Sequence, residues 1–215
     1  MEFFSPHATK VFLRLAPEKQ KKVFDAAAAE FAQHGFDSAN TNVIARRAGV
    51  SVGSLFQYFT TKQALLLGLV DYGTQTLLVP VIESMREPRD ATALFRHMLL
   101  CAREFAQNYP DYNRVYLGVT AALPSPMATQ LARRIEERTI ASYRRAIRRD
   151  MDVENSVKEG CLAFLMDNLV MSYQFSFASE YYHERLIAYT GIDPHANGDR
   201  LIEELCGMVE RLLKN

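Results

Sequence analysis

The sequence predicts an all-α protein. Apolar residues recur three and four positions apart along most of the 215-residue chain, which is the period of an amphipathic helix. No segment alternates strictly between apolar and polar residues, as a half-buried strand would, and no internal repeat is present. Cap and turn residues divide the periodic segments into about nine helices. We expect a small N-terminal domain, residues 1–62, joined by a long helix to a larger helical domain, residues 63–215.

The N-terminal domain is expected to contain three short helices. Pro17 suits the first position of a helix, and an apolar stripe follows it as far as His34-Gly35. A second helix spans about residues 41–48 and ends at Gly49. Ser51 can cap the third helix, because its hydroxyl can accept a backbone N–H of the first turn.

The larger domain begins with the long helix. Thr60 and Gln63 resemble a capping box that opens this helix, which we expect to run through about Met85 with a bend near Pro80. Turn and cap residues then separate the later helices. These are expected near residues 91–108, 111–122, 126–149, 153–182 and 199–214.

Two of the later helices carry more apolar surface than one chain covers easily. In the helix near 153–182, one apolar row contains Leu165 and Leu169, and a second row runs from Leu162 to Phe177. The C-terminal helix near 199–214 has a similarly wide apolar stripe. We therefore expect a homodimer in which these two helices from each copy pack at roughly 20° as a four-helix interface. The alternative is a single well-filled core.

Charge is distributed unevenly along the chain. Residues 1–62 hold 8 basic and 5 acidic residues, and the remainder holds 17 basic and 20 acidic residues, so the formal net charge of zero conceals a basic front. Such an asymmetry indicates that a polyanionic partner meets the N-terminal domain.

The three cysteines, Cys101, Cys161 and Cys206, are widely spaced within apolar stretches. This spacing fits neither a disulfide framework nor a zinc site, so we expect buried thiols and a cytoplasmic protein. The richest apolar stretch, residues 65–82, is interrupted by glycine, aspartate and proline. We therefore expect neither a signal peptide nor a membrane span.

Motifs of catalysis are missing from the sequence. The five histidines lack zinc-ligand spacing, and no glycine-rich phosphate loop, nucleophile elbow or paired-carboxylate signature occurs. We therefore expect no enzymatic activity, no catalytic residues, no metal and no cofactor.

Residues 41–62 have the layout of a helix-turn-helix. Ala45 supplies the small residue needed where two helices cross, and Gly49 can adopt the positive φ that ends the first helix. Leu55 and Phe59, four residues apart, bury the second helix against the first. The outward face, expected to meet DNA, then consists of Val52, Gly53, Ser54, Gln57 and Tyr58.

This segment resembles the TetR family of bacterial regulators. The resemblance covers about residues 18–66 and rests on Phe31, Gly35-Phe36, residues 41–45, 49–51 and 53–59, and Lys62. It implies a DNA-binding front, an effector-binding body and dimerisation through the last two long helices. The expected function is a ligand-responsive, sequence-specific transcriptional regulator. Its dimer would act as a repressor bound to an inverted-repeat operator in double-stranded DNA. A largely apolar small molecule would release the dimer from the operator.

The resemblance also implies how the DNA contacts are divided. Val52 would pack on a thymine methyl, Gly53 would permit close approach, and Gln57 would pair with adenine. Asn42 lies where some members reach a base, and Ser51 begins the recognition helix. The phosphate anchors would be Thr41, Ser54, Tyr58 and Lys62.

Three neighbouring side chains depart from this scheme or leave it open. Phe56 stands where the family often has a phosphate-binding tyrosine, so we expect Phe56 only to pack. Arg46 and Arg47 fit either a phosphate contact or a solvated helix face.

Effector-binding residues are expected on the helix around Met166 to Phe177 and on its neighbours. An effector pocket is mostly apolar with a few polar groups. The candidates are His97, Cys101, Tyr112, Tyr116, Tyr143, Met166, Asn168 and Tyr173. The alternative is that these residues belong to an ordinary core.

Two other functions remain open at this point. One is a helical DNA-binding architectural protein without an effector. The other is a small-molecule carrier or enzyme whose front resembles a helix-turn-helix by accident. A regulator protects one short inverted repeat, an architectural protein binds many sequences nearly equally, and a carrier binds no duplex.

Overall fold

The computed structural model describes residues 3–79, 88–122, 140–149 and 156–214. The described residues form helices and contain no strand, which confirms the all-α class. Eleven helices have complete bounds, against about nine expected. Three helices were not expected: a short helix before Pro17, a π-helix within the expected long helix, and a separate helix over Glu180–Thr190. The helix expected over 126–149 is not among the eleven.

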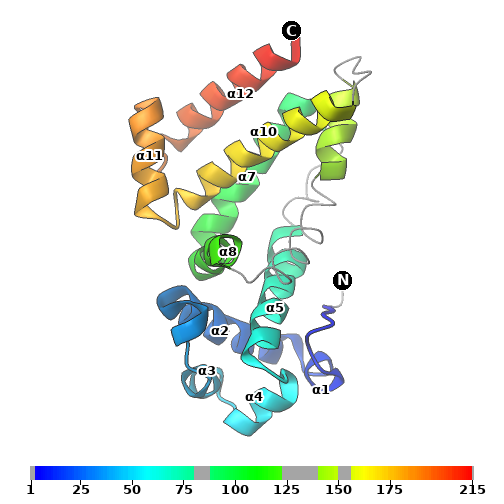
Figure 1. Cartoon of the computed structure of the whole chain (residues 1–215), viewed down its shortest axis with the longest axis vertical. Coiled ribbons are helices and arrows are strands. Elements are labelled where there is room, and N and C mark those ends of the chain that lie inside the picture. Colours follow the sequence, from blue (N-terminus) through cyan, green and yellow to red (C-terminus); the bar gives the residue numbers. More distant parts are fainter. Residues whose placement is uncertain (1–2, 80–87, 123–139, 150–155, 215) are drawn as a thin grey trace.

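The N-terminal end of the molecule contains four helices (Figure 1). They are α1 (Lys10–Leu13), α2 (Pro17–Ser38), α3 (Thr41–Ala48) and α4 (Val52–Tyr58). The break predicted at His34-Gly35 is present as a kink inside α2, where Gly35 has φ 69°. Gly49 ends α3 with φ 70°, as predicted.

The remaining helices form the body above them (Figure 1). They are α5 (Lys62–Tyr72), the π-helix η1 (Gly73–Leu78), α7 (Ala91–Asn108), α8 (Pro110–Ala122), α10 (Ser156–Phe175), α11 (Glu180–Thr190) and α12 (Gly198–Lys214), with a further helical stretch at 140–149.

Two predicted boundaries were wrong. The helix expected over 153–182 ends at Phe175, and α11 begins only at Glu180. The Ser176 hydroxyl donates to the Tyr173 carbonyl at 2.6 Å, and such a local side-chain bond favours leaving the helix. The cap of α5 is Thr61, which accepts the Ala64 N–H at 3.0 Å, rather than Thr60 paired with Gln63. The expected bend at Pro80 and the first part of the 126–149 helix lie outside the described residues.

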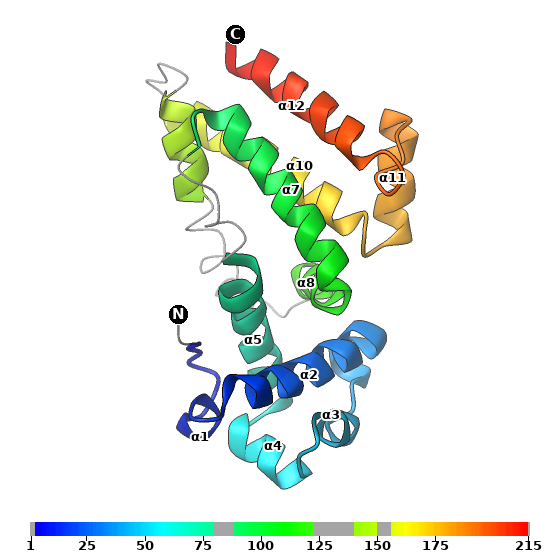
Figure 2. The same ribbon diagram turned by 180° about the vertical axis from the view of Figure 1, so that it is seen from behind.

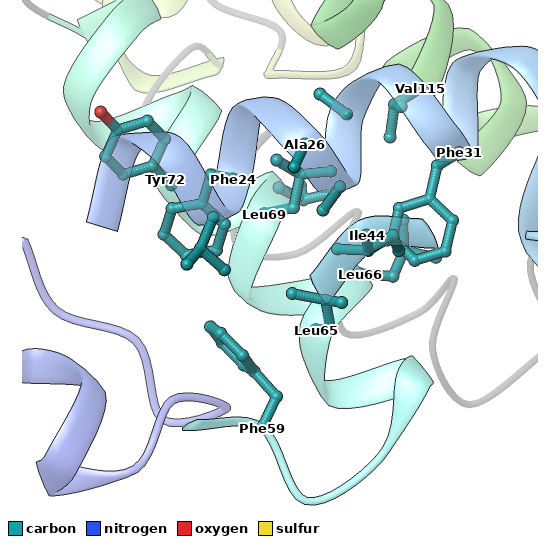
Figure 3. Close-up of a cluster of buried hydrophobic side chains, with 14 of the residues drawn as sticks. Phe24, Ala26, Phe31, Ile44, Phe59, Leu65, Leu66, Leu69, Tyr72 and Val115 are labelled. Carbon is teal, nitrogen blue, oxygen red and sulfur yellow. The ribbon is translucent and has the colours of Figure 1, made fainter. Parts of the chain in front are cut away.

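One hydrophobic core joins the N-terminal helices to α5. Figure 3 shows Phe24, Phe31, Ile44, Phe59 and Leu69 converging from α2, α3, the end of α4 and α5. Val115 of α8 belongs to the same cluster. Each such buried side chain contributes about 1.5–3 kcal/mol to the hydrophobic stabilisation of the fold.

A second core lies at the opposite end of the molecule, where α7 packs against α10 and α12 (Figure 2). Its large buried side chains include Phe95 and Leu99 of α7, Tyr143 of the 140–149 stretch and Tyr173 of α10. None of the described helices is both long enough and apolar enough to cross a membrane.

The cysteine prediction was right for two residues and wrong for the third. Cys101 and Cys206 are buried, whereas Cys161 is exposed on α10. The periodic pattern could not distinguish the exposed cysteine from the buried ones, because α10 carries apolar residues on both its buried and its exposed side.

Candidate nucleic-acid interface and effector cavity

The turn between α3 and α4 is held by backbone bonds. The Val50 N–H donates to the Ala45 carbonyl at 3.0 Å, and the Gly49 N–H donates to the Arg46 carbonyl at 3.2 Å. Ala45, 1% exposed, provides the small side chain at the crossing. The angle between α3 and α4 is therefore set by the chain itself, as a helix-turn-helix requires.

The exposed face of α4 is a continuous stripe. Gly53, Phe56 and Gln57 are exposed, and their spacing of three and four residues places them on one side of the helix. Leu55, on the other side, is buried. The structure thus places Gly53 and Gln57 outward, where the sequence prediction had them.

Two aromatic residues of α4 have exchanged their expected places. Tyr58 was expected to face outward but is only 6% exposed, with its ring 5.6 Å from that of Phe12. Phe56 was expected to pack but is 42% exposed. The reason is α1, which the sequence did not reveal and which supplies Phe12 to cover the Tyr58 side of α4.

The start of α4 is occupied by its own cap. The Ser51 hydroxyl accepts the Ser54 N–H at 2.9 Å and lies 2.8 Å from the Ser54 hydroxyl, so both predicted DNA contacts also serve the helix terminus. Val52 is half-buried against the core rather than fully outward.

The start of α3 is capped by Asn40, which accepts the Asn42 N–H at 2.9 Å. Asn42 is exposed, and its side-chain amide donates to Asn40 at 3.1 Å. Thr41 is half-buried at the first position of the helix.

Lys62, which was predicted to anchor a DNA phosphate, is bonded within the protein. Its ammonium donates to the carbonyls of Asp37 at 2.9 Å and Ala39 at 3.2 Å, and it lies 5.0 Å from the centroid of the Phe36 ring. Lys62 therefore joins the start of α5 to the C-terminal end of α2.

The two arginines of α3 differ in their surroundings. Arg47 lies 3.5 Å from the carboxylate of Glu30, a side chain that is 3% exposed. Glu30 also accepts the Asn40 N–H at 3.1 Å, so it positions the start of α3 as well as Arg47. Arg46 is exposed and enters no ion pair with any residue in the described ranges.

A small cavity lies where η1 meets α7, α8 and α10. Its walls include Leu69, Thr74, Phe105, Tyr112, Tyr116 and Gln174. Its volume of about 30 Å³ is comparable to that of one liquid water, so a larger guest must displace wall side chains.

The predicted effector residues do not converge on one cavity. Tyr112 and Tyr116 line the small cavity. Tyr143 and Asn168 line a separate groove of about 680 Å³ between the 140–149 stretch and α10. His97 lies in a surface groove near the end of α12 with Cys101 beside it, whereas Met166 and Tyr173 belong to the second core. Periodicity does not fix how one helix is rotated against the next, so the sequence could not show which of these side chains share a cavity.

Gln174 is a cavity residue that was not among the predicted ones. Its amide donates to Asn113 at 2.9 Å, and the Asn113 amide donates to the Gln174 carbonyl at 3.1 Å. Both side chains are buried, so this pair is a fixed polar element in a mostly apolar wall.

Tyr112 connects the cavity to α2. Its hydroxyl donates to Asp25 at 2.9 Å, and Asp25 also pairs with Lys21 at 2.6 Å. Burial raises the pKa of Tyr112, and the Asp25 carboxylate raises it further, so the hydroxyl remains a donor. A cavity wall is thereby bonded directly to the helix that supports α3.

Exposed apolar side chains gather on the helices expected at a dimer interface. Phe164 and Leu165 of α10 are 72% and 42% exposed, and Met208 and Leu212 of α12 are 44% and 48% exposed. Within the described parts of the chain, no group of three or more metal-ligating side chains occurs.

Comparison with known proteins agrees with this geometry. The family of bacterial regulatory proteins named tetR matches residues 23–69. The transcriptional regulator RutR of Escherichia coli K12 is 29% identical over 103 residues, which are 48% of this chain and 48% of RutR. The transcriptional repressor Rv1474c of Mycobacterium tuberculosis is 25% identical over 160 residues, which are 71% of this chain and 80% of that protein. The chain thus spans about half the length of RutR.

Solved structures share the fold over nearly the whole chain. A TetR family regulator from Chloroflexus aurantiacus superposes with a TM-score of 0.63 at 21% identity, covering 95% of this chain and 97% of that one. AibR, solved with isovaleryl coenzyme A and operator DNA, superposes with a TM-score of 0.61 at 14% identity, covering 88% of this chain and 97% of AibR. Residues 23–69, which contain the helix-turn-helix, thus match the DNA-binding segment of the TetR family of bacterial regulatory proteins, and the described chain shares its fold with solved TetR family regulators.

Proposed function

We propose that this regulator binds an inverted-repeat operator as a homodimer, acts as a repressor in the cytoplasm, and is released by a small, largely apolar effector. The observation that carries the proposal is the exposed stripe of α4, which stands on a rigid turn beside α3. In this proposal, residues 1–62 bind DNA, and residues 63–215 bind the effector and form the dimer.

The DNA contacts follow from what the stripe offers. Gln57 can pair with adenine, and Val52 stays a reader at the edge of the stripe. Phe56 joins them, because an exposed aromatic ring on a recognition helix can pack on a thymine methyl. The remaining predicted positions would bind or approach the DNA backbone: Thr41, Asn42, Ser51, Gly53 and Ser54. Lys62 and Tyr58 would contribute by holding the helices that carry these residues in place.

The dimer is supported by the exposed apolar residues of α10 and α12. Phe164 and Leu165 lie in adjacent positions of α10, and Met208 and Leu212 lie one turn apart on α12. Surface of this kind is usually covered by a partner. Two linked DNA-binding domains (heads, residues 1–62 of each copy) bind two half-sites as one unit. The operator affinity is therefore well above that of one head.

Effector control is supported by the contact between the cavity and α2. A guest larger than the cavity must displace wall side chains, and Tyr112 is one of them, packed closely against η1 because a Cβ added at Gly73 would lie 3.2 Å from its ring. Moving Tyr112 strains its bond to Asp25 and shifts α8 against α2. AibR provides a precedent, as its structure holds both an acyl coenzyme A and operator DNA.

Selection of bound duplexes from a random-sequence pool tests the DNA-binding part. We expect an inverted repeat whose half-sites are separated by whole helical turns, with affinity that falls steeply as salt rises. Binding all sequences nearly equally would identify an architectural protein instead, and binding none would overturn the proposal.

Small molecules that raise the melting temperature are then tested for release of the selected operator. Because coupling is reciprocal, the operator must weaken effector binding by the same factor as the effector weakens operator binding. A ligand that stabilises the protein without changing operator affinity would remove that ligand as an effector.

A further inference from the structure

Helix α1 is bonded to the C-terminal end of α4. The Thr9 N–H donates to the Tyr58 carbonyl at 3.0 Å, and the Thr9 hydroxyl donates to the Gln57 carbonyl at 2.8 Å. These carbonyls belong to the last turn of α4 and have no partner within that helix. Thr9 thus ties α1 to the helix expected in the DNA groove.

Packing makes this attachment rigid. Phe12 of α1 is fully buried, with its ring 5.6 Å from Tyr58 and 4.6 Å from Phe59. At the other end of α1, the side chain of Gln20 donates to the carbonyls of Phe12 and Leu13 at 3.2 Å. Helix α1 is therefore bonded to α4 at one end and to α2 at the other.

The side of α1 that faces away from Phe12 is basic. Lys10 begins α1, and Arg14 is its C-cap and keeps a right-handed helical conformation, so these two exposed residues, four positions apart, lie on one side of α1. Neither of them enters an ion pair within the described residues. Exposed Lys19 and Lys22 add positive charge in the first turns of α2, next to one exposed acidic side chain, Glu18.

Figures 1 and 2 show α1 and α3 on opposite sides of α4, at the same end of the molecule. Both helices contact α4 directly. The major groove is about 12 Å wide and admits one helix, so the two sugar-phosphate backbones lie on either side of that helix. When α4 enters the groove, α3 meets one backbone and α1 meets the other.

We propose that α1 is a second backbone-binding surface, at which Lys10 and Arg14 bind phosphates of the strand opposite to the one that α3 contacts. This inference rests on the proposed DNA-binding function. The phosphate contacts fix the position of α4 in the groove and carry no sequence information of their own.

The test is a double variant, Lys10→Gln with Arg14→Gln, measured on the duplex obtained by selection with the wild-type protein. The affinity should fall for every operator sequence by a similar factor, at least tenfold, without changing their ranking. The slope of log affinity against log salt should become shallower by about 0.9 for each lost phosphate contact, with four such side chains in the dimer.

The matched control removes two positive charges from the body, Arg114→Gln with Arg185→Gln, which lie on α8 and α11. This control should keep the wild-type slope. The exchange Lys10→Arg with Arg14→Lys should also keep it, because each position retains its charge. If the exchange loses as much slope as the double glutamine variant, charge is not what the surface contributes, and the proposal fails.

Hydroxyl-radical footprinting locates the contact. The wild-type protein should protect backbone positions on both sides of each half-site, and the double variant should lose protection on one side only. If the wild-type protein binds the duplex and the double variant matches its affinity, slope and footprint, the inference about α1 is wrong while the DNA-binding function stands. If the wild-type protein binds no duplex, both are wrong.

Discussion

The DNA-binding end and the body use their polar groups differently. At the DNA-binding end, side chains satisfy helix termini of neighbouring elements: Thr9 bonds to the end of α4, Gln20 to the end of α1, and Lys62 to the end of α2. In the body, polar bonds instead join side chains of different helices, as in the ion pairs Arg103–Asp199 and Arg148–Glu159, and the described grooves and cavities open between these helices. We therefore expect the DNA-binding end to move as one unit, because its elements are bonded through backbone carbonyls, and the body to adapt to a guest.

The largest expected effect distinguishes the two exchanged aromatic residues of α4. Tyr58→Ala should lower the free energy of unfolding by about 3–5 kcal/mol, because it removes a ring from the core of the rigid end. Phe56→Ala should change it by less than about 0.5 kcal/mol, because the ring is at the surface. Urea unfolding of both variants measures this difference. Equal destabilisation by the two would contradict the assigned places.

Phe56→Ala should act on DNA instead. We expect it to remove about 0.8 kcal/mol of discrimination at one thymine of the operator, the value of one buried methyl group. Replacing that thymine with deoxyuridine, which lacks only the methyl group, should weaken wild-type binding and leave the variant unaffected. If every deoxyuridine substitution affects both proteins equally, Phe56 does not read a thymine.

The next effect concerns the surface between two bodies. Phe164→Glu should shift the dimer toward monomer and weaken operator binding by about 100-fold, since the two heads no longer bind as one unit. Tyr189→Glu is the control, because Tyr189 is 79% exposed on α11, away from the expected interface. Sedimentation velocity measures the oligomeric state. An intact dimer with Phe164→Glu would move the interface elsewhere.

A smaller effect tests the bond between body and head. Tyr112→Phe removes the hydroxyl that donates to Asp25, and hydrogen bonds to charged groups are worth about 1.5–3 kcal/mol. We expect the effector still to bind and its release factor on the operator to fall by about tenfold. Tyr109→Phe, at a neighbouring ring, is the control. An unchanged release factor in Tyr112→Phe would exclude this bond from the coupling.

The smallest effect is a pH dependence of the body. Burial raises the pKa of Asp167 to about 6, so the folded state binds more protons than the unfolded state between about pH 4 and pH 6. The free energy of unfolding should therefore decrease as the pH rises through this window, by less than about 1 kcal/mol for a partly exposed group. Asp167→Asn should remove that decrease. Thermal melts from pH 4 to pH 7 measure it, and parallel curves for the two proteins would contradict it.

The same contrast explains what the sequence could and could not predict. The α3–turn–α4 segment was predictable because its signals are local: Gly49 ends one helix and Ser51 caps the next. Helix α1 was not, since it has only four residues and its cap bonds to Gln57, forty-eight residues away. The places of Phe56 and Tyr58 depend on α1, so that error followed from the first.

The cavity could not be predicted for a different reason. Its walls come from η1, α7, α8 and α10, and which side of each helix faces the others depends on their packing angles. Tyr112 and Tyr116 were found because they are aromatic residues on a predicted helix. Gln174 was missed because a buried glutamine needs its partner, Asn113, which lies 61 residues away in the sequence.

The bonds from Thr9 have a consequence for engineering new operator specificities. Transplanting α4 alone into another regulator would leave the carbonyls of Gln57 and Tyr58 without their donor and the ring of Tyr58 without Phe12. The portable module is therefore discontinuous: residues 9–14 have to travel together with residues 41–62. Chimeras built with both segments should retain the recognition of the parent, whereas chimeras with the second segment alone would present a loosened helix to the groove.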